Sequence, residues 1–80
     1  MPENNHITAC KMKPGQTGKI IEIQGGQRLN ARLSALGIIP GRNITKISDM
    51  LMRGPVTVKT GNTQIAIGYG MADKIIVAPE

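Results

Sequence analysis

The stretch LSALGIIPGRNI, residues 33–44, decides the fold because it ends a helix and turns the chain toward a strand. Gly37 stands where a helix C-cap takes the left-handed conformation, which glycine adopts at little cost. Ile38 can then fold back onto the last helical turn. Pro40 prevents the helix from resuming, and Gly41 supplies the positive φ of a type II turn. The stretch therefore predicts a helix-to-strand corner.

The residues before this corner predict a short helix over positions 27–36. Leu29, Leu33 and Leu36 recur at i, i+4 and i+7 and form one apolar stripe. A helix of this length is marginally stable by itself. We therefore expect the stripe to pack against a core.

Short strands are expected on both sides of this helix. In the first strand, Ile21 and Ile23 would share one face. In the strand after the corner, Ile44 and Ile47 have opposite parity and can share a face only across a bulge. A two-residue Gly61-Asn62 turn between alternating segments predicts a hairpin. The expected strands cover residues 18–23, 42–49, 55–60, 63–67 and 74–78, and one helical turn is expected within 68–72.

This layout indicates a mainly β fold of about five strands, with one short α-helix after the first long strand. It is typical of a small, strongly curved barrel, which closes its sheet to remove exposed edges. A chain of 80 residues has room for one domain and one modest core. We expect a flexible tail over residues 1–7 and a single domain over 8–80. Without Phe or Trp, the core must consist of Ile, Leu, Val and Met side chains.

Composition also indicates the cellular compartment of the protein. The single cysteine, Cys10, cannot form an internal disulfide, which fits a reducing cytoplasm. No segment approaches the roughly 20 apolar residues of a membrane-spanning helix. The N-terminus MPENNH lacks the charged start and apolar run of a signal peptide. We therefore expect a soluble cytoplasmic protein.

The net charge of +5 would attract nucleic acid, an anionic membrane surface or an acidic protein. The basic residues form no run and have no aromatic residues between them, so we expect most of them to cover an ordinary solvated surface. These residues are Lys11, Lys13, Lys19, Arg28, Arg32, Arg42, Lys46, Arg53, Lys59 and Lys74.

The sequence predicts no metal site, no cofactor and no catalytic residue. His6 and Cys10 are four residues apart and could both bind a metal if that segment were helical, but a tetrahedral site needs two more ligands. The chain contains no second His or Cys. No nucleophile has an adjacent base. The paired glycines at 25–26 and the segment 68–70 fit turns better than a phosphate loop.

Two features could form a contact site. The apolar run MLM, residues 50–52, falls inside an expected turn; it would either face water beside an arginine or cap one end of the barrel. Two arginines four residues apart lie on the outward face of the helix, where they would meet an acidic partner or solvent. The hypothetical contact surface comprises Arg28, Arg32, Met50, Leu51, Met52 and Arg53.

Five motifs in order carry a family resemblance. They are G-K-I-I at 18–21, L-x-x-L-G-I-x-P-G-x-x-I at 33–44, G-P-V-x-V at 54–58, I-A-I-G at 65–68 and M-A-x-K-I-x-V at 71–77. Over roughly residues 8–78 the chain resembles the FeoA family. The resemblance implies a small cytoplasmic protein with an SH3-like β-barrel that accompanies ferrous iron uptake. It also implies a non-enzymatic role on the FeoB membrane permease, whose cytoplasmic portion carries a GTPase domain.

Three hypotheses follow. The first is an adaptor that binds and modulates FeoB, at the inner face of the membrane through that partner. The second is a small-barrel nucleic-acid binder, against which the lack of stacking aromatics weighs. The third is a metal-responsive domain that binds a divalent ion directly, because the chain also resembles the C-terminal module of repressors of the diphtheria-toxin-repressor type. Weak homo-oligomerisation is compatible with all three.

Overall fold

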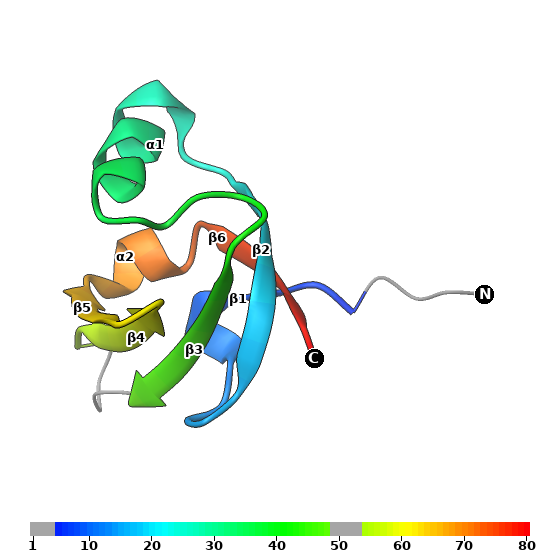
Figure 1. The fold of residues 1–80 in the computed structure, drawn as a ribbon. Helices are drawn as coiled ribbons and strands as arrows, with labels where there is room; N and C mark the ends of the chain where they lie inside the picture. Colours follow the sequence, from blue (N-terminus) through cyan, green and yellow to red (C-terminus); the bar gives the residue numbers. More distant parts are fainter. Residues whose placement is uncertain (1–4, 49–53) are drawn as a thin grey trace.

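The computed structural model describes residues 5–48 and 54–80, and within them the fold is mainly β (Figure 1). The strands and helices agree in order and type with those expected from residue 17 onward. Their bounds are β1 (Ile7–Thr8), the 3-10 helix η1 (Ala9–Lys11), β2 (Thr17–Ile23), α1 (Gly26–Ala35), β3 (Asn43–Ser48), β4 (Val56–Thr60), β5 (Thr63–Ile67), α2 (Tyr69–Ala72) and β6 (Ile75–Pro79).

In the described part of the chain, six antiparallel strands form one sheet in the order β1-β6-β2-β3-β4-β5. The sheet curves strongly, with α1 above it and α2 between β5 and β6 (Figure 1). This architecture confirms the mainly β, SH3-like class. Among the strands described, the two edge strands β1 and β5 do not pair with each other, so the curved sheet has open edges.

The first strand is shorter than sequence patterns can detect. β1 pairs Ile7 with Val77 and Thr8 with Ile76, and η1 follows it directly. Elements of two and three residues are too short to show a periodicity. For that reason the sequence predicted neither of them.

The corner after α1 has the predicted structure. The N–H of Ile38 donates to the carbonyl of Leu33 at 2.9 Å, and the N–H of Gly37 donates to Ser34 at 2.9 Å. This bond pair defines the Schellman motif, and Gly37 holds the required positive φ of 89°. Leu33 and Ile38 are both fully buried in the core, so the hydrophobic half of the motif is present as well.

The turn that follows connects α1 to β2 as well as to β3. Gly41 has a φ of 97°, and the N–H of Arg42 donates to Ile39 at 3.1 Å, as a type II turn with Pro40 in its second position requires. Gly41 donates to the carbonyl of Ile20, and Ile20 donates back to Arg42, each at 2.8 Å. The corner is thereby tied to β2.

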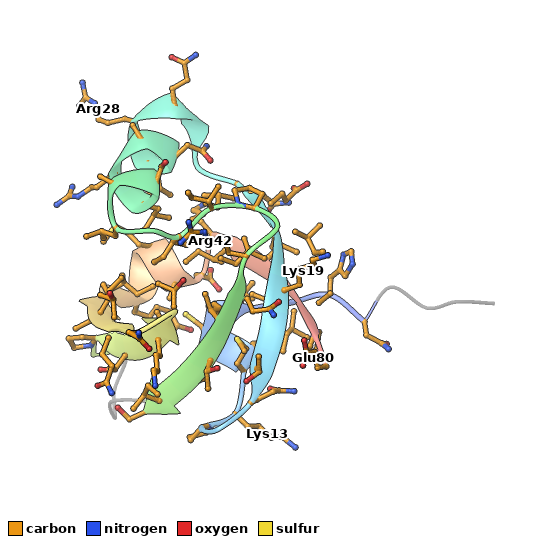
Figure 2. The ribbon with its side chains drawn as sticks, viewed as in Figure 1. Lys13, Lys19, Arg28, Arg42 and Glu80 are labelled. Carbon is orange, nitrogen blue, oxygen red and sulfur yellow. The ribbon has the colours of Figure 1, made fainter. Side chains whose placement is uncertain are left out.

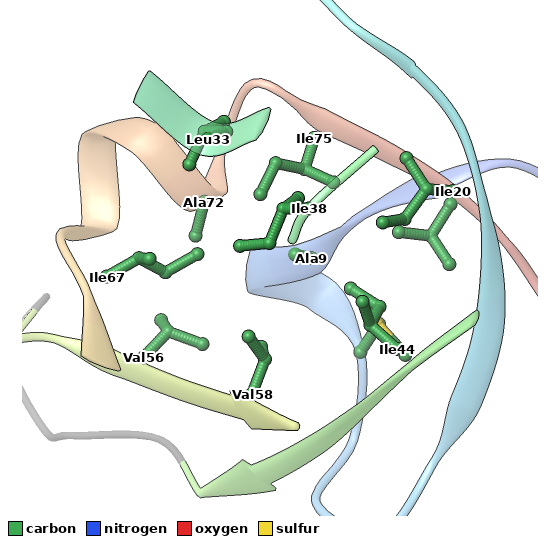
Figure 3. Close-up of a cluster of buried hydrophobic side chains, with 12 residues drawn as sticks. Ala9, Ile20, Leu33, Ile38, Ile44, Val56, Val58, Ile67, Ala72 and Ile75 are labelled. Carbon is green, nitrogen blue, oxygen red and sulfur yellow. The ribbon is translucent and has the colours of Figure 1, made fainter. Parts of the chain in front are cut away.

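The core lies between the curved sheet and the two helices (Figure 3). Every strand from β2 to β6, both α-helices and η1 contribute to it, which is how a chain of this size closes a core without large aromatic side chains. In the described residues its buried apolar members are Ala9, Met12, Ile20, Leu33, Ile38, Ile44, Val56, Val58, Ile67, Ala72, Ile75 and Val77.

A bulge in β2 changes which isoleucine is buried. Ile20 pairs with Val77 but Glu22 pairs with the next residue, Ile76, so Ile21 is an extra residue on this strand. Ile20 is 1% exposed, whereas Ile21 is 37% exposed. The expectation that Ile21 and Ile23 share one face did not include this bulge, which shifts the alternation by one residue and makes Ile20 the fully buried isoleucine of the strand.

A second bulge occupies β3, as the parity of Ile44 and Ile47 required. Lys46 pairs with Val58 but Ser48 pairs with Thr57, which leaves Ile47 as the extra residue. Ile44 is fully buried and Ile47 is half-buried. The residue that shares the inner face with Ile44 is Lys46.

The apolar stripe of α1 is shorter than expected. Leu33 is fully buried and Leu29 packs against the core, but Leu36 is 40% exposed. The helix ends at Ala35, and Leu36 is its C-cap, where the backbone already leaves the helical path. The prediction that Leu36 belongs to the buried stripe is therefore wrong.

Replacing Gly37 with Ala tests the helix cap. A Cβ at this position would meet other atoms only at 3.6 Å or more, so the strain comes from the positive φ and not from crowding. We expect Gly37→Ala to lower the free energy of unfolding by about 1 kcal/mol, measured by urea denaturation.

Gly70→Ala is the matched control, because Gly70 lies within α2, has no positive φ and has open space around the added Cβ. This control should be neutral or slightly stabilising. Equal losses in the two variants would contradict the assignment of the cost to the φ of Gly37.

Candidate partner-binding surface

Helix α1 carries an exposed basic row on the side away from the core. Arg28, Arg32 and Leu36 follow one another at a spacing of four residues, and all three are exposed. Figure 2 shows Arg28 pointing away from the sheet at the outer end of the molecule. Leu29 and Leu33, on the opposite side, hold the helix to the core. The predicted outward orientation of the two arginines agrees with this arrangement.

No negative charge within α1 compensates the positive charges of Arg28 and Arg32. The helix sequence GQRLNARLSA contains no acidic residue, so neither arginine has a carboxylate one turn away. Arg32 lies in the last helical turn, where a positive charge interacts favourably with the helix dipole. Guanidinium groups in this state can bind a carboxylate with two parallel hydrogen bonds.

A third guanidinium stands at the end of the same helix. Arg42 is exposed, and its Nη1 lies 3.9 Å from the position that a side chain on Gly37 would take. The corner brings Arg42 back beside the C-terminus of α1, a proximity that residue spacing alone did not reveal (Figure 2). We call Arg28, Arg32, Leu36 and Arg42 the α1 surface.

The other predicted contact residues are Met50, Leu51, Met52 and Arg53, which lie outside the described residues. Their role stays a prediction.

The segment from His6 to Cys10 does not form the helix that a shared metal site would need. His6 precedes β1, and Cys10 lies in η1. The thiol of Cys10 donates to the carbonyl oxygen of Tyr69 at 3.3 Å. Within residues 5–48 and 54–80, no three His, Cys, Asp or Glu side chains come together as a group able to hold a metal ion.

The described surface has no pocket. Among the same residues, no helix is both long and apolar enough to cross a membrane.

Lys46 is the one basic residue of the described chain that is buried, which corrects its assignment to the solvated surface. It is fully buried, and its Nζ donates to the carbonyls of Met12 at 2.8 Å, Ala9 at 3.0 Å and Cys10 at 3.1 Å. An ammonium group has three donors, and here each meets an acceptor. Lys46 therefore supports the fold and adds no charge to a surface. Lys46 lies two residues after Ile44, so the alternation of a strand already indicated that both side chains share the inner face.

The sequence matches a known protein family over most of its length. The sequence profile of the FeoA domain matches residues 7–79. The chain belongs to the FeoA family. Among proteins with curated descriptions, none matches it significantly in sequence.

Solved structures agree with the family. A crystal structure of a FeoA, described as an iron uptake regulatory protein, is 29% identical with a TM-score of 0.88, and the match covers 94% of this chain and 99% of that one. The FeoA of Stenotrophomonas maltophilia, described as a prokaryotic SH3 domain protein complexed with zinc, is 18% identical with a TM-score of 0.78 over 92% of this chain and 95% of that one.

The fold also occurs within larger proteins. A manganese-dependent transcriptional repressor matches 100% of this chain with a TM-score of 0.87 and 16% identity, but only 45% of its own length is covered. At this identity the likeness concerns the fold alone. The FeoA family consists of small accessory proteins associated with ferrous iron transport and is not a family of enzymes.

Replacing Lys46 with Met tests whether the buried amine is structural. Methionine fills similar volume but removes the donor to three carbonyl oxygens. Ala9 still accepts from the N–H of Met12 at 3.3 Å, whereas the carbonyls of Cys10 and Met12 lose the donor that Lys46 supplies, at about 1–3 kcal/mol for each unsatisfied group. We expect Lys46→Met to lower the free energy of unfolding by about 3 kcal/mol or more, measured by urea denaturation.

Lys59→Met, on the exposed side of the neighbouring strand β4, is the matched control and should change stability by no more than about 0.5 kcal/mol. If Lys46→Met behaved like this control, the three hydrogen bonds would have no structural weight.

Proposed function

We propose that this protein is a non-enzymatic accessory protein of ferrous iron uptake that binds and modulates a FeoB-type membrane GTPase and permease from the cytoplasmic side. The observation that carries the proposal is the exposed basic α1 surface on a FeoA-family domain. The S. maltophilia relative supports it, because that protein is described as a candidate ferrous iron transport activating factor.

The α1 surface suits an acidic protein partner better than a small molecule. It is convex, because α1 stands on the outside of the molecule (Figure 1), and the described surface has no pocket. Arg28 and Arg32 present charge, and Leu36 adds an apolar contact at the end of the row. Arginine is enriched at protein interfaces and is often among the residues that contribute most to binding.

A nucleic acid is the weaker candidate partner. Single-stranded nucleic acids are held by aromatic platforms, and the one aromatic side chain of this chain is Tyr69, which is 38% exposed on α2. The burial of Lys46 also removes one positive charge from the surface. A metal-responsive role would instead require ligands that the described residues do not bring together.

An amide-shift titration of the labelled protein with the soluble GTPase portion of FeoB tests the proposal. We expect perturbations in the residues of the α1 surface, and in residues 49–54 if the predicted loop takes part. The control is a nucleic-acid titration at two salt concentrations, because binding to phosphates weakens steeply with salt.

Salt-sensitive shifts with nucleic acid but none with the GTPase portion would overturn the proposal in favour of the second hypothesis. Shifts at His6 and Cys10 on adding ferrous or zinc ion alone would favour the metal-responsive role.

Reversing the charge of the α1 row tests which residues carry the contact. We expect Arg28→Glu combined with Arg32→Glu to weaken binding to the GTPase portion by about tenfold or more, since two exposed arginines are replaced by repelling carboxylates. Calorimetric titration measures the change.

Lys13→Glu combined with Lys19→Glu is the matched control, because it changes the net charge equally at exposed positions away from α1 (Figure 2). Equal weakening in the two double variants would show that net charge, and not the α1 surface, governs binding.

A further inference from the structure

Strand β5 is an open edge of the sheet. It pairs with β4 over its full length, from Thr63 opposite Thr60 to Ile67 opposite Val56. On its other side no strand of the described chain follows, and residues 63–67 form no further backbone hydrogen bond there with any described residue. Figure 1 shows β5 at the periphery of the molecule.

The hairpin geometry shows which backbone groups face this edge. A two-residue loop closes on a hydrogen-bonded pair, here Thr60 and Thr63, and antiparallel pairs alternate between bonded and non-bonded. Ile65 and Ile67 therefore bond to β4. The N–H and C=O groups of Gln64 and Ala66 point away from β4, toward the open edge.

Strand β5 itself lacks the charged residues, proline and bulge that normally prevent strand addition. The sequence TQIAI contains no charged residue and no proline. The register with β4 runs without a bulge, whereas the β2–β6 and β3–β4 pairs are both interrupted by one. The opposite edge of the sheet is protected by its shortness, because β1 has two residues.

We propose that two copies of this chain associate through antiparallel pairing of their β5 strands. The register sets Gln64 opposite the partner's Ala66, Ala66 opposite the partner's Gln64, and Ile65 opposite the partner's Ile65. The two pairs of Gln64 with Ala66 exchange hydrogen bonds through the backbone N–H and C=O groups that point away from β4. Each pair forms two bonds, so four hydrogen bonds join the two chains. The two isoleucines form the close non-bonded pair between them.

Ile65 gives this register an apolar contact as well as hydrogen bonds. Its side chain is half-buried and packs against the core, so part of it remains exposed. The partner's Ile65 would cover that part on the same face. Gln64 and Ala66, which are exposed on the other face, would lie side by side with no charge between them.

The uncharged edge does not oppose a second copy and holds no charge that would select an acidic partner instead. Two chains of net charge +5 repel each other, and the uncharged residues 63–67 allow close approach with little local repulsion. The nearest charged residue in the pairing is Lys59, opposite Gln64. Three strand spacings and an offset of two residues along the strand would separate it from the partner's Lys59, about 16 Å in all, which exceeds the Debye length of about 8 Å at physiological salt.

Sedimentation equilibrium over a concentration series tests the proposal. Because a five-residue edge makes a small interface, we expect a dimer with a dissociation constant of roughly 0.1–1 mM. Amide shifts on dilution should concentrate in residues 63–67. We expect Gln64→Lys combined with Ala66→Lys to weaken dimerisation at least tenfold, because each added lysine lies opposite another.

The matched control is Gln27→Lys combined with Ser34→Lys, which adds the same charge at exposed positions of α1. Mixing the Lys double variant with Gln64→Glu combined with Ala66→Glu should restore association as a heterodimer, which shows that both variants are folded. A monomer at about 1 mM, equal weakening by the control, or no association of the mixed variants would each overturn the proposal.

Discussion

The hydrogen bonds of Lys46 hold the segment between β1 and β2 against β3. Its ammonium donates to Ala9, Cys10 and Met12, its backbone N–H donates to Gln16, and its carbonyl accepts from Gly15. The three side-chain acceptors belong to η1 and the residue after it, where a helix leaves carbonyls without internal partners. Lys46 thus finds acceptors for its own buried ammonium group and provides a donor to the carbonyls at the end of η1. Because an unpaired buried ammonium costs several kcal/mol, the N-terminal segment and β3 must form together.

The sequence predicts those parts of the fold that depend on neighbours along the chain. The cap at Gly37 and the turn at Gly41 follow from backbone rules, and the Gly61-Asn62 hairpin follows from alternation on both sides. The exposure of Ile21 depends on a bulge in the pairing with a distant strand, so periodicity could not decide it. The parity of Lys46 with Ile44 indicated its inner face, but the carbonyls that accept from it lie in a distant segment. The same limit applies to the α1 surface. The outward face of Arg28 and Arg32 follows from helical spacing, whereas the position of Arg42 beside the helix end depends on the corner in three dimensions.

The two bulges lie in the central strands, whereas the open edge belongs to a hairpin that has no bulge. Extra residues in β2 and β3 bend the central strands, which lets one short sheet surround a core made of small aliphatic side chains. The β4–β5 hairpin has no bulge and stays regular, so its outer strand ends the sheet with its hydrogen-bonding groups aligned. A closed barrel would have used those groups internally. Here the curvature is sufficient to bury the core, and the edge is left for another chain.

The α1 surface and the β5 edge lie on different parts of the molecule, and the net charge acts on them in opposite ways (Figure 1). The α1 surface concentrates positive charge, so salt screens its attraction for an acidic partner. The β5 edge is uncharged, so salt screens only the general repulsion between two basic chains and strengthens their pairing. Since the two surfaces do not overlap, a dimer would present two α1 surfaces at once. A membrane partner with two binding portions would then hold the dimer more tightly than a single copy, because the second contact forms at high effective concentration. Weak pairing of β5 would therefore be sufficient for the proposed accessory role at a membrane partner.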